Sequence, residues 1–400
     1  MGASDDRLKT GLQTRVLHAG SPPFDDGVAP VNVPVVRTST VRFASDAERA
    51  ALHHRREAGE AVSTYGRHGT ATHRALEAAI GETEGASDVL LAPSGLSAIA
   101  LVFIALLSPG DHVLVQDSVY GPVRERVEPL LTRLGVTFSY FGASDGFPEA
   151  LMRPQTRLIY VESPSSFLYE VIDLPALAAF ARQHGIVLAA DNTWGAGLLY
   201  QPLALGADIS VQATTKYLGG HSDLMQGVVS TSNASLARKL RDTHDSLGLS
   251  VSADDAYLAL RGIRTLAVRL AQHGRNALEV AQFLLTEHDA VARVFYPALP
   301  DDPGHALWQR DFKGANGLVS FAFRQADGQL ASAFVDALRL FGLGASWGGY
   351  ESLALIAPPS RVREHSYWRG SGSIVRLHVG LEDTADLIDD LSQAFRRVLR

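Results

Sequence analysis

An aspartate and a lysine stand at the ends of two predicted strands and are residue types that can do chemistry together. The apolar run Ile186–Asp191 ends on the acid, and the run Ile209–Ala213 leads through two threonines to Lys216. If both strands belong to one parallel sheet, Asp191 and Lys216 project into the same crevice, because ligands in such sheets lie beyond the carboxyl ends of the strands. A lysine amine there can form a Schiff base with an aldehyde, and a carboxylate can keep a ring nitrogen protonated. The pair therefore suits pyridoxal phosphate.

Each of the two residues taken alone also fits a structural role. Lys216 would then be a surface lysine, and Asp191 a strand-end acid that caps a helix. The surroundings of the lysine favour chemistry, because Lys216 lies in the run Thr214–His221, and a solvated lysine is not ordinarily enclosed by hydroxyls and glycines.

Short apolar runs alternate with helical stretches between residues 70 and 230. The predicted strands are Asp88–Ala92, His112–Gln116, Val136–Phe141, Arg157–Glu162, Ile186–Asp191, Ile209–Ala213 and Gly227–Ser230. Most are apolar throughout, which is typical of parallel strands covered by helices on both faces. The helices predicted between them are Leu96–Leu107, Val123–Leu134 and Pro175–His184, with Ser94 and Asp173 near two of their starts. The pattern predicts an α/β fold with a mainly parallel sheet.

The sequence divides into three predicted parts. Residues 1–65 are rich in Pro, Arg and small residues, with a helical stretch at 46–60, and are expected to form an arm that wraps over another body. Residues 66–255 contain the sheet and are expected to bind the cofactor, and residues 256–400 to form a smaller α+β domain. The elements predicted near and within this last part are a helical run Ala253–Leu285, strands near Ala292–Phe295, Gly317–Phe323 and Ser373–Val379, a glycine-punctuated loop at 342–349, and a closing helix from Thr384.

Composition excludes several classes of protein. The 400 residues carry 36 Lys and Arg against 43 Asp and Glu, a formal charge of −7, which gives nucleic-acid phosphates no electrostatic reason to bind. The absence of cysteine excludes disulfides, thiolate metal sites and cysteine nucleophiles. The most apolar stretch, Leu96–Leu107, is far shorter than the ~20 residues that span a bilayer. Met1–Arg7 lacks the basic start and apolar run of a signal peptide. We therefore expect a soluble, cytoplasmic protein that binds neither nucleic acid nor membrane.

Further motifs carry a resemblance to a known family over nearly the whole chain. They are Thr14-Arg15, His18–Gly20, Asp191–Trp194, Gly219–Asp223, Arg261–Leu266, Pro297–Pro300, Ser346–Ser352 and Arg376–Asp383. With them the sequence resembles the pyridoxal-phosphate enzymes of cysteine and methionine metabolism, and within that family most of all the bacterial cystathionine β-lyases. The resemblance implies the fold of type I pyridoxal-phosphate enzymes, which is aspartate-aminotransferase-like. It also implies a carbon–sulfur β-lyase of methionine biosynthesis and transsulfuration that converts L-cystathionine to L-homocysteine, pyruvate and ammonia.

The resemblance assigns a set of residues to the cofactor. They are Tyr65, Arg67, Ser94, Gly95, Leu96, Tyr120, Asp191, Thr215 and Lys216. Backbone N–H groups at the predicted helix start Ser94–Leu96 would bind the phosphate at the positive end of the helix dipole, with a hydroxyl added by Thr215. Tyr120 would stack on the pyridine ring. Taken alone, Ser94–Leu96 also fits an ordinary strand-to-helix turn and Tyr120 a core tyrosine.

The resemblance also implies catalytic, substrate and subunit contacts. Lys216, Tyr120 and Tyr65 would be catalytic, with Lys216 removing the Cα proton. Arg376 would hold the substrate carboxylate bidentately, and Ser346, Trp347 and Tyr120 would also contact substrate. The alternative for Arg376 is a structural ion pair, because an unpaired guanidinium in an apolar strand is costly.

Two residues near the start of the chain imply an oligomer. Tyr65 and Arg67 match family positions that reach the cofactor phosphate of a neighbouring subunit, which implies a homo-oligomer with shared sites, a tetramer by resemblance. The plainer interpretation of Arg67 is a solvated loop charge.

Two departures from the β-lyase pattern leave the substrate open. His68 stands where that pattern has a second arginine, and Glu125 stands where it has an aspartate. Both would lie near the distal end of cystathionine, so other cysteine S-conjugates are an alternative substrate class.

Three alternatives to β-elimination of cystathionine are weighed. The first is a γ-acting member of the family, such as cystathionine γ-lyase, cystathionine γ-synthase or methionine γ-lyase; Trp347 favours β, and methionine γ-lyase commonly has a cysteine that this chain lacks. The second is a binding protein that has lost the chemistry, against which the presence of Lys216, Asp191, Tyr120 and Arg376 argues. The third is a metal hydrolase built on His53, His54, His68, His73 and His221, whose spacings fit no HExxH motif, so we expect no metal.

Overall fold

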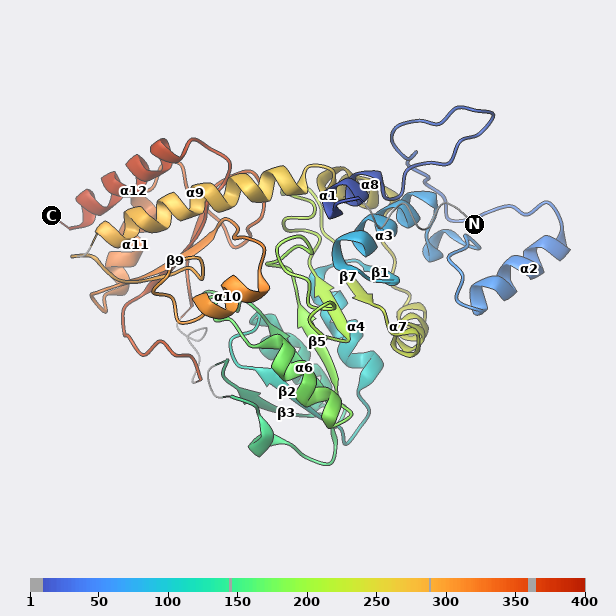
Figure 1. Cartoon of the computed structure of the whole chain (residues 1–400), viewed down its shortest axis with the longest axis horizontal. Coiled ribbons are helices and arrows are strands. Elements are labelled where there is room, and N and C mark those ends of the chain that lie inside the picture. The colour runs from blue at the N-terminus through green and yellow to red at the C-terminus, as the bar shows by residue number, and fades with distance from the viewer. Residues whose placement is uncertain (1–9, 144–145, 288, 359–364, 400) are drawn as a thin grey trace.

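The computed structural model describes residues 10–143, 146–287, 289–358 and 365–399. Two sheets organise these residues, and Figure 1 shows them one at each side of the molecule, with the long helix α9 (Leu266–Thr286) running over the top towards the smaller sheet. Residues 1–9 of the expected arm, including the start Met1–Arg7, lie outside the described residues. Within the described ranges, no helix is both long and apolar enough to cross a membrane.

The larger sheet has seven strands in the order β1-β7-β6-β5-β4-β2-β3. They are β1 (Asp88–Ala92), β2 (His112–Gln116), β3 (Thr137–Phe141), β4 (Thr156–Glu162), β5 (Val187–Asp191), β6 (Ile209–Gln212) and β7 (Gly227–Thr231). Each matches a predicted strand to within one residue at either end. The mainly parallel arrangement is confirmed, with β7 alone running against both of its neighbours, β1 and β6.

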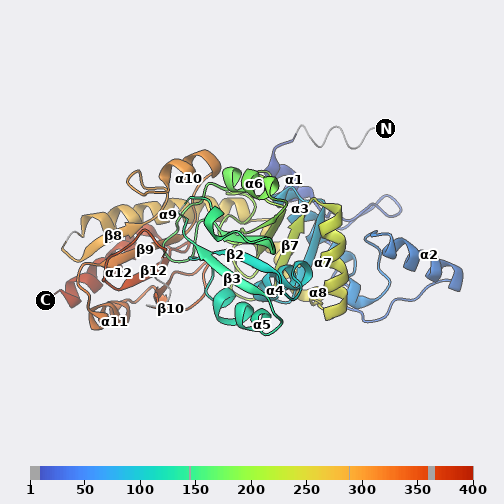
Figure 2. The ribbon, with the colours of Figure 1, turned by 90° about the horizontal axis from the view of Figure 1, so that it is seen from below.

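Helices cover both faces of this sheet, which explains why most of its strands are apolar throughout. One face packs on α4 (Gly95–Leu106), α5 (Glu128–Thr132) and α7 (Ala234–Leu247), and the other on α3 (Ala71–Glu84), α6 (Leu174–Gln183) and α8 (Ala253–Ile263). Figure 2 shows α4 and α5 on one side of β2 and β3 and α6 on the other. Successive residues of β4 alternate between the two cores, with Tyr160 in one and Val161 in the other.

The predicted helix starts are confirmed, and two predicted helices are broken. Ser94 and Asp173 each accept a backbone N–H through the side chain at the beginning of α4 and α6. The predicted helix Val123–Leu134 begins as a π-helical turn and continues as the short α5, where Pro129 supplies no N–H. The predicted run Ala253–Leu285 is two helices, because the chain turns at Arg264, whose guanidinium donates to carbonyls in and after α1 (Leu12–His18).

The smaller sheet has five strands in the order β10-β11-β12-β9-β8. They are β8 (Val291–Phe295), β9 (Leu318–Phe323), β10 (Gly342–Leu343), β11 (Leu353–Ile356) and β12 (Ile374–His378). The helices α9, α11 (Gly328–Ala337) and α12 (Thr384–Val398) enclose a second core with it, and α10 (His305–Asp311) lies in the connection from β8 to β9. Strands β8, β9 and β12 and the closing helix confirm predictions. The short β10 forms the first two residues of the predicted glycine loop 342–349, β11 follows that loop, and neither strand was predicted.

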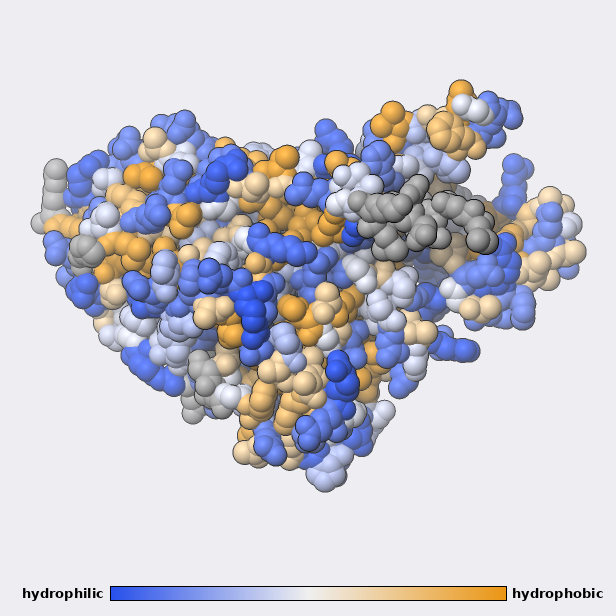
Figure 3. Space-filling model, viewed as in Figure 1, coloured by the Kyte–Doolittle hydropathy of each residue, from blue (hydrophilic) through white to orange (hydrophobic). Residues whose placement is uncertain are grey.

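Residues 10–65 pack only partly on the rest of the chain. Helix α1 lies against α3, and Val16 is buried there. The following segment and α2 (Asp46–Glu57) project away from both sheets (Figure 1), and no residue of α2 is buried. Phe24, Val28 and Val31 expose between 71% and 94% of their surface, and the projecting loop carries orange, apolar residues in Figure 3.

Candidate active site

Three chain segments predicted to carry chemistry meet at one edge of the larger sheet. β1, β5 and β6 all end there, and Asp191 pairs with Val211 of β6. The turn that opens α4 lies against the segment after β6: a Cβ on Gly95 would be 2.7 Å from the Cβ of Ala213. The absence of a side chain at Gly95 therefore allows the helix start to approach the segment that leads to Lys216.

The carboxyl group of Asp191 is buried and has hydrogen-bond donors but no cation. Its exposed fraction is 6%. Oδ1 accepts from the backbone N–H of Thr193 at 2.9 Å and from its hydroxyl at 2.6 Å, and Oδ2 accepts from the Tyr160 hydroxyl at 3.2 Å. Burial raises the pKa of Asp191, against these hydrogen bonds. Among the described residues no cation pairs with Asp191, so the site fits a protonated ring nitrogen from outside the chain.

The amine of Lys216 lies beside two of the residues predicted to contact substrate. Nζ donates to Ser346 Oγ at 2.8 Å and lies 5.3 Å from the centre of the Trp347 ring. Burial, and to a lesser degree the Arg376 guanidinium, lower the pKa of Lys216 from 10.5 to about 8. A substantial fraction of the amine is therefore neutral near pH 8 and can act as a nucleophile or accept a proton.

Arg376 is buried in β12 without a carboxylate partner in the part of the chain that the structure describes. Its exposed fraction is 7%, and Nη2 donates to the carbonyls of Ala345 and Ser346, each at 3.0 Å. Nε is buried and has no hydrogen-bond partner, and burial lowers the pKa of the guanidinium. The structural ion pair considered as an alternative is thus not seen among these residues. The guanidinium can therefore bind the carboxylate of a ligand.

The loop Ser346–Gly349 packs directly on the backbone of Lys216. Gly348 has φ +92°, and a Cβ there would lie 2.8 Å from the backbone nitrogen of Tyr217. The Gly348 N–H donates to Nε2 of His378 at 3.1 Å. Burial lowers the pKa of His378 to about 3, which keeps this imidazole neutral and able to accept. β12 therefore holds the loop at two places, through Arg376 and His378.

Gly348→Ala is expected to reduce turnover by roughly 100-fold, because a displacement of about 1 Å of the loop over Lys216 costs that much. Steady-state kinetics on the cofactor-loaded enzyme would measure it. Gly110→Ala is the matched control, since Gly110 has φ +93° but a Cβ there would meet nothing within 4 Å. Equal losses in both variants would contradict the steric explanation and point to backbone strain alone.

The residues predicted to bind phosphate lie together at the start of α4 and beside the lysine. Gly95 and Leu96 belong to the first turn of α4, where N–H groups have no acceptor within the helix and suit an anion. The Ser94 hydroxyl accepts the Ser97 N–H at 3.1 Å. The Thr215 hydroxyl donates to the carbonyl of Gln226 at 3.0 Å and accepts its N–H at 2.9 Å. The helix start thus offers free amides, whereas both hydroxyls already have partners within the chain.

Tyr120 lies at the same edge of the sheet and is not a core tyrosine. Its exposed fraction is 45%, and its backbone N–H donates to the carboxylate of Glu162. Glu162 ends β4 and pairs with Asp191 in the sheet register. The backbone of Tyr120 therefore lies near the end of β4, the strand next to the one that ends on Asp191, and its side chain is partly exposed.

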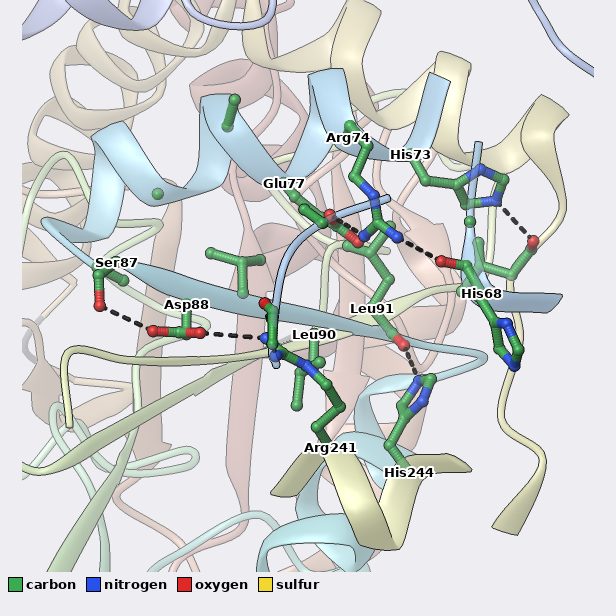
Figure 4. Close-up of a pocket in the computed structure, with 18 of the residues that line it drawn as sticks. His68, His73, Arg74, Glu77, Ser87, Asp88, Leu90, Leu91, Arg241 and His244 are labelled. Atoms are coloured by element: carbon green, nitrogen blue, oxygen red, sulfur yellow. Dashed lines mark hydrogen bonds and ion pairs between the residues drawn. The ribbon is translucent and has the colours of Figure 1, made fainter. Parts of the chain in front are cut away.

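Tyr65 and Arg67 are not brought to Lys216 within one chain. Tyr65 exposes 43% of its surface, and the Arg67 guanidinium donates to the carbonyl of Asp245 at 3.1 Å. Arg67 and His68 line a separate hollow of about 670 Å³ between α3, β1 and α7. Figure 4 shows His68 in that hollow, with its carbonyl accepting from Arg74.

The remaining histidines considered for a metal lie at three separate places in the fold. His53 and His54 are on α2, His73 accepts the Thr70 N–H, and His221 bonds to the carbonyl of Gly219. The described residues contain no group of three His, Asp or Glu side chains that could hold a metal ion.

Two groups that hold the site were not predicted from the sequence. Tyr160 bonds to Asp191, and His378 holds the loop at Gly348. Both lie within apolar strands, where the sequence gives no signal of which polar side chain meets a loop from another part of the chain.

Comparison with known proteins agrees with the resemblance. A family model described as "Cys/Met metabolism PLP-dependent enzyme" matches residues 13–396. The chain is 53% identical to a cystathionine beta-lyase from Bordetella avium, over 96% of this chain and 98% of that protein. It is 40% identical to the cystathionine beta-lyase MetC of Escherichia coli (strain K12), over 97% and 99% respectively. A solved structure, metB from Corynebacterium glutamicum, matches with a TM-score of 0.87 and 31% identity over 98% of this chain and 99% of that chain. The chain therefore belongs to the family of pyridoxal 5′-phosphate (PLP)-dependent enzymes of Cys/Met metabolism.

Proposed function

We propose that the protein cleaves the carbon–sulfur bond of L-cystathionine by β-elimination, with water, to L-homocysteine, pyruvate and ammonia. The observation that carries the proposal is the group formed by Lys216, Ser346, Trp347 and Arg376. It combines an amine with a pKa of about 8 and a buried guanidinium that has no carboxylate partner among the described residues. The printed names of the relatives from Bordetella avium and Escherichia coli support the substrate.

Bound at this edge, the cofactor would supply an electron sink for the charge that develops at Cα. Asp191 would hold the proton of the ring nitrogen, and Tyr120 would stack on the ring. The amides of Gly95 and Leu96 would bind the phosphate, with the Ser94 and Thr215 hydroxyls turning from their present partners to join them.

The chain's own groups would then move the protons. Lys216 would accept the proton from Cα and deliver a proton to the leaving sulfur, while Ser346 fixes the position of Nζ. Arg376 would bind the substrate α-carboxylate and orient the Cα–H bond towards Lys216. Trp347 would cover the amine and exclude water, which strengthens these charge interactions.

A product assay with L-cystathionine tests this proposal. Purified, PLP-loaded protein is expected to release pyruvate and homocysteine. Release of 2-oxobutyrate and cysteine would instead place the protein among γ-lyases. Turnover of other cysteine S-conjugates without cystathionine would show that His68 and Glu125 have changed recognition of the distal end. Burial and Arg56 lower the pKa of His68 to about 4, so at neutral pH it offers no charge to a distal carboxylate.

The pH dependence of cofactor capture follows from the pKa of Lys216. In cofactor-free protein, the rate at which Lys216 captures added PLP is expected to rise with pH through about 8 and to level off above it, because only the neutral amine attacks an aldehyde. Stopped-flow absorbance would measure it. Arg376→Gln removes a cation that lowers this pKa, so the rising limb should move to higher pH. If the capture rate rises at the same pH in the wild type and in Arg376→Gln, Arg376 does not lower the pKa of Lys216.

We further propose a cytoplasmic homotetramer with three parts, an arm at 1–65, a cofactor domain at 66–255 and a C-terminal domain at 256–400. Its active sites would be shared, with Tyr65 and Arg67 of one chain serving the cofactor of its neighbour. The exposure of Tyr65 and of the apolar residues on the projecting arm supports this assembly.

Shared sites predict complementation between two inactive variants. Chains with Arg67→Ala and chains with Lys216→Ala should each be nearly inactive, and co-expression under two affinity tags should restore activity, since roughly half of the sites in a one-to-one hybrid are intact. Activity of the doubly purified hybrid measures this. Two differently tagged Lys216→Ala chains serve as the control, and a proven hybrid without recovery would count against sharing.

A further inference from the structure

A buried carboxyl group outside the predicted site connects the strand ends that carry Asp191 and Lys216. Glu84 is the last residue of α3 and is 1% exposed. Its Oε1 accepts from the side-chain amide of Asn192 at 2.8 Å and from that of Gln212. Asn192 directly follows Asp191, and Gln212 ends β6, four residues before Lys216. One oxygen atom thus holds the ends of β5 and β6 together.

The surroundings of Asn192 leave little room for these groups to move. Its amide also donates to the Tyr200 carbonyl at 3.0 Å. A Cβ on Gly195 would lie 2.3 Å from Asn192 Oδ1, and a Cβ on Gly197 would lie 3.0 Å from Glu84 Oε1. Two glycines therefore allow the chain after Asp191 to close over the carboxyl group.

A second bridge, made by Thr193, joins the same two strand ends. The Thr193 hydroxyl donates to Asp191 Oδ1 at 2.6 Å and accepts the Ala213 N–H at 3.0 Å. Asp191 is thus flanked by Asn192 and Thr193, and each is tied to the segment that leads from β6 to Lys216. A change at Glu84 would loosen one of these two ties.

The charge state of Glu84 fits a role that needs no negative charge. No cation pairs with it among the described residues, and the charged group acting on it is Asp191. Burial and Asp191 raise the pKa of Glu84 to about 7, against hydrogen bonds from Ser210, Asn192 and Gln212. When it is protonated, Glu84 adds no second anion beside the carboxylate that must hold the ring proton.

We propose that Glu84 is a positioning residue that fixes the separation of Asp191 from Lys216 by holding Asn192 and Gln212, and so sets how closely Asp191 contacts the cofactor ring nitrogen. The inference rests on the proposed roles of Asp191 and Lys216 in binding the cofactor. It assigns Glu84 no contact with substrate. Because Glu84 takes no part in moving the proton on the substrate's Cα, we expect its replacement to affect the cofactor ring and turnover more than substrate binding.

The signal for this residue is present in the sequence. Leu76, Ile80 and Glu84 are spaced by four residues and share the buried face of α3. An acid at the end of an apolar stripe is costly unless it is hydrogen-bonded, which marks it for a specific function.

The test compares Glu84→Ala and Glu84→Gln with Glu77→Ala. Glu77 is a matched control because it lies on the same helix with a side chain 18% exposed, paired with Arg74 and facing the hollow of Figure 4. Three measurements are made besides thermal stability: the dissociation constant for PLP added to cofactor-free protein, the pH titration of the visible absorption band, and kcat and KM.

Glu84→Ala is expected to weaken PLP binding and to lower kcat, each by roughly 10–100-fold, as for other residues that orient a site. The pH titration of the visible band should shift, and KM should change less than threefold. Glu84→Gln keeps an oxygen that can accept from Asn192 and Gln212, so it should restore most of each property. Glu77→Ala should lower stability without a spectral change. If Glu84→Ala does not fold, Asn192→Ala removes one tie and should give a smaller shift of the same kind.

Equal behaviour of the Glu84 and Glu77 variants, with an unchanged band and unchanged PLP affinity, would overturn the proposal and leave Glu84 a structural residue. Failure of the proposed function is a separate result. Wild-type protein that binds PLP with its visible band but leaves cystathionine intact would reject the β-lyase proposal, while the spectral comparison of Glu84 variants would still decide this one.

Discussion

Lys216→Ala is expected to abolish the visible absorption band of the PLP-loaded protein and to lower turnover by roughly 10⁴-fold or more, the scale seen when a covalent and proton-transfer residue is removed. Its amine is held by Ser346 beside Trp347, and its pKa of about 8 suits both attack on an aldehyde and removal of a proton. Among the described residues no second lysine lies near these groups, because Lys239 and Lys313 lie elsewhere in the fold.

Borohydride reduction of the loaded protein sharpens this test. Reduction should fix the cofactor to the peptide that contains Lys216, and mass spectrometry should find the other lysines unmodified. Lys313→Ala is the control, because its amine bonds to Gln201 at 2.8 Å away from the sheet edge. Full activity in Lys216→Ala, or label on another lysine, would refute the assigned role.

The large sheet was predictable from the sequence because both of its faces are covered. Its strands are therefore apolar at successive positions, as in Leu158–Val161, and stand out against polar connections. The reversed direction of β7 was not predictable from its composition, because a buried strand has the same side chains in either direction. The break at Arg264 depends on carbonyls near α1, some 250 residues earlier in the chain, and so has no local signal.

The active site also has features that the sequence predicts and features that it does not. Asp191 and Lys216 follow strands, so their convergence is a consequence of the sheet. The contact of Lys216 with Ser346 joins segments from the two sheets, and the contact of Gly348 with His378 joins the loop to β12; residue spacing encodes neither distance. Tyr65 and Arg67 lie apart from Lys216 in one chain, and this separation is what a site shared between subunits would require.

Arg376→Gln is expected to lower kcat/KM by roughly 100- to 1000-fold, because removing one partner of a buried charge pair costs about 3–4 kcal/mol and about 1.4 kcal/mol is tenfold. PLP binding and the visible band should persist, since Arg376 contacts the loop carbonyls of Ala345 and Ser346 and lies on the substrate side of Lys216. Arg376→Lys should not restore activity, because an ammonium group cannot form two parallel bonds to a carboxylate while also holding the loop.

Steady-state kinetics with L-cystathionine, compared with an amine that lacks the α-carboxylate, measures the effect. In the wild type the carboxylate should matter greatly, and in Arg376→Gln the two compounds should react at similar rates. If the wild type already fails to distinguish them, Arg376 serves only to hold the loop.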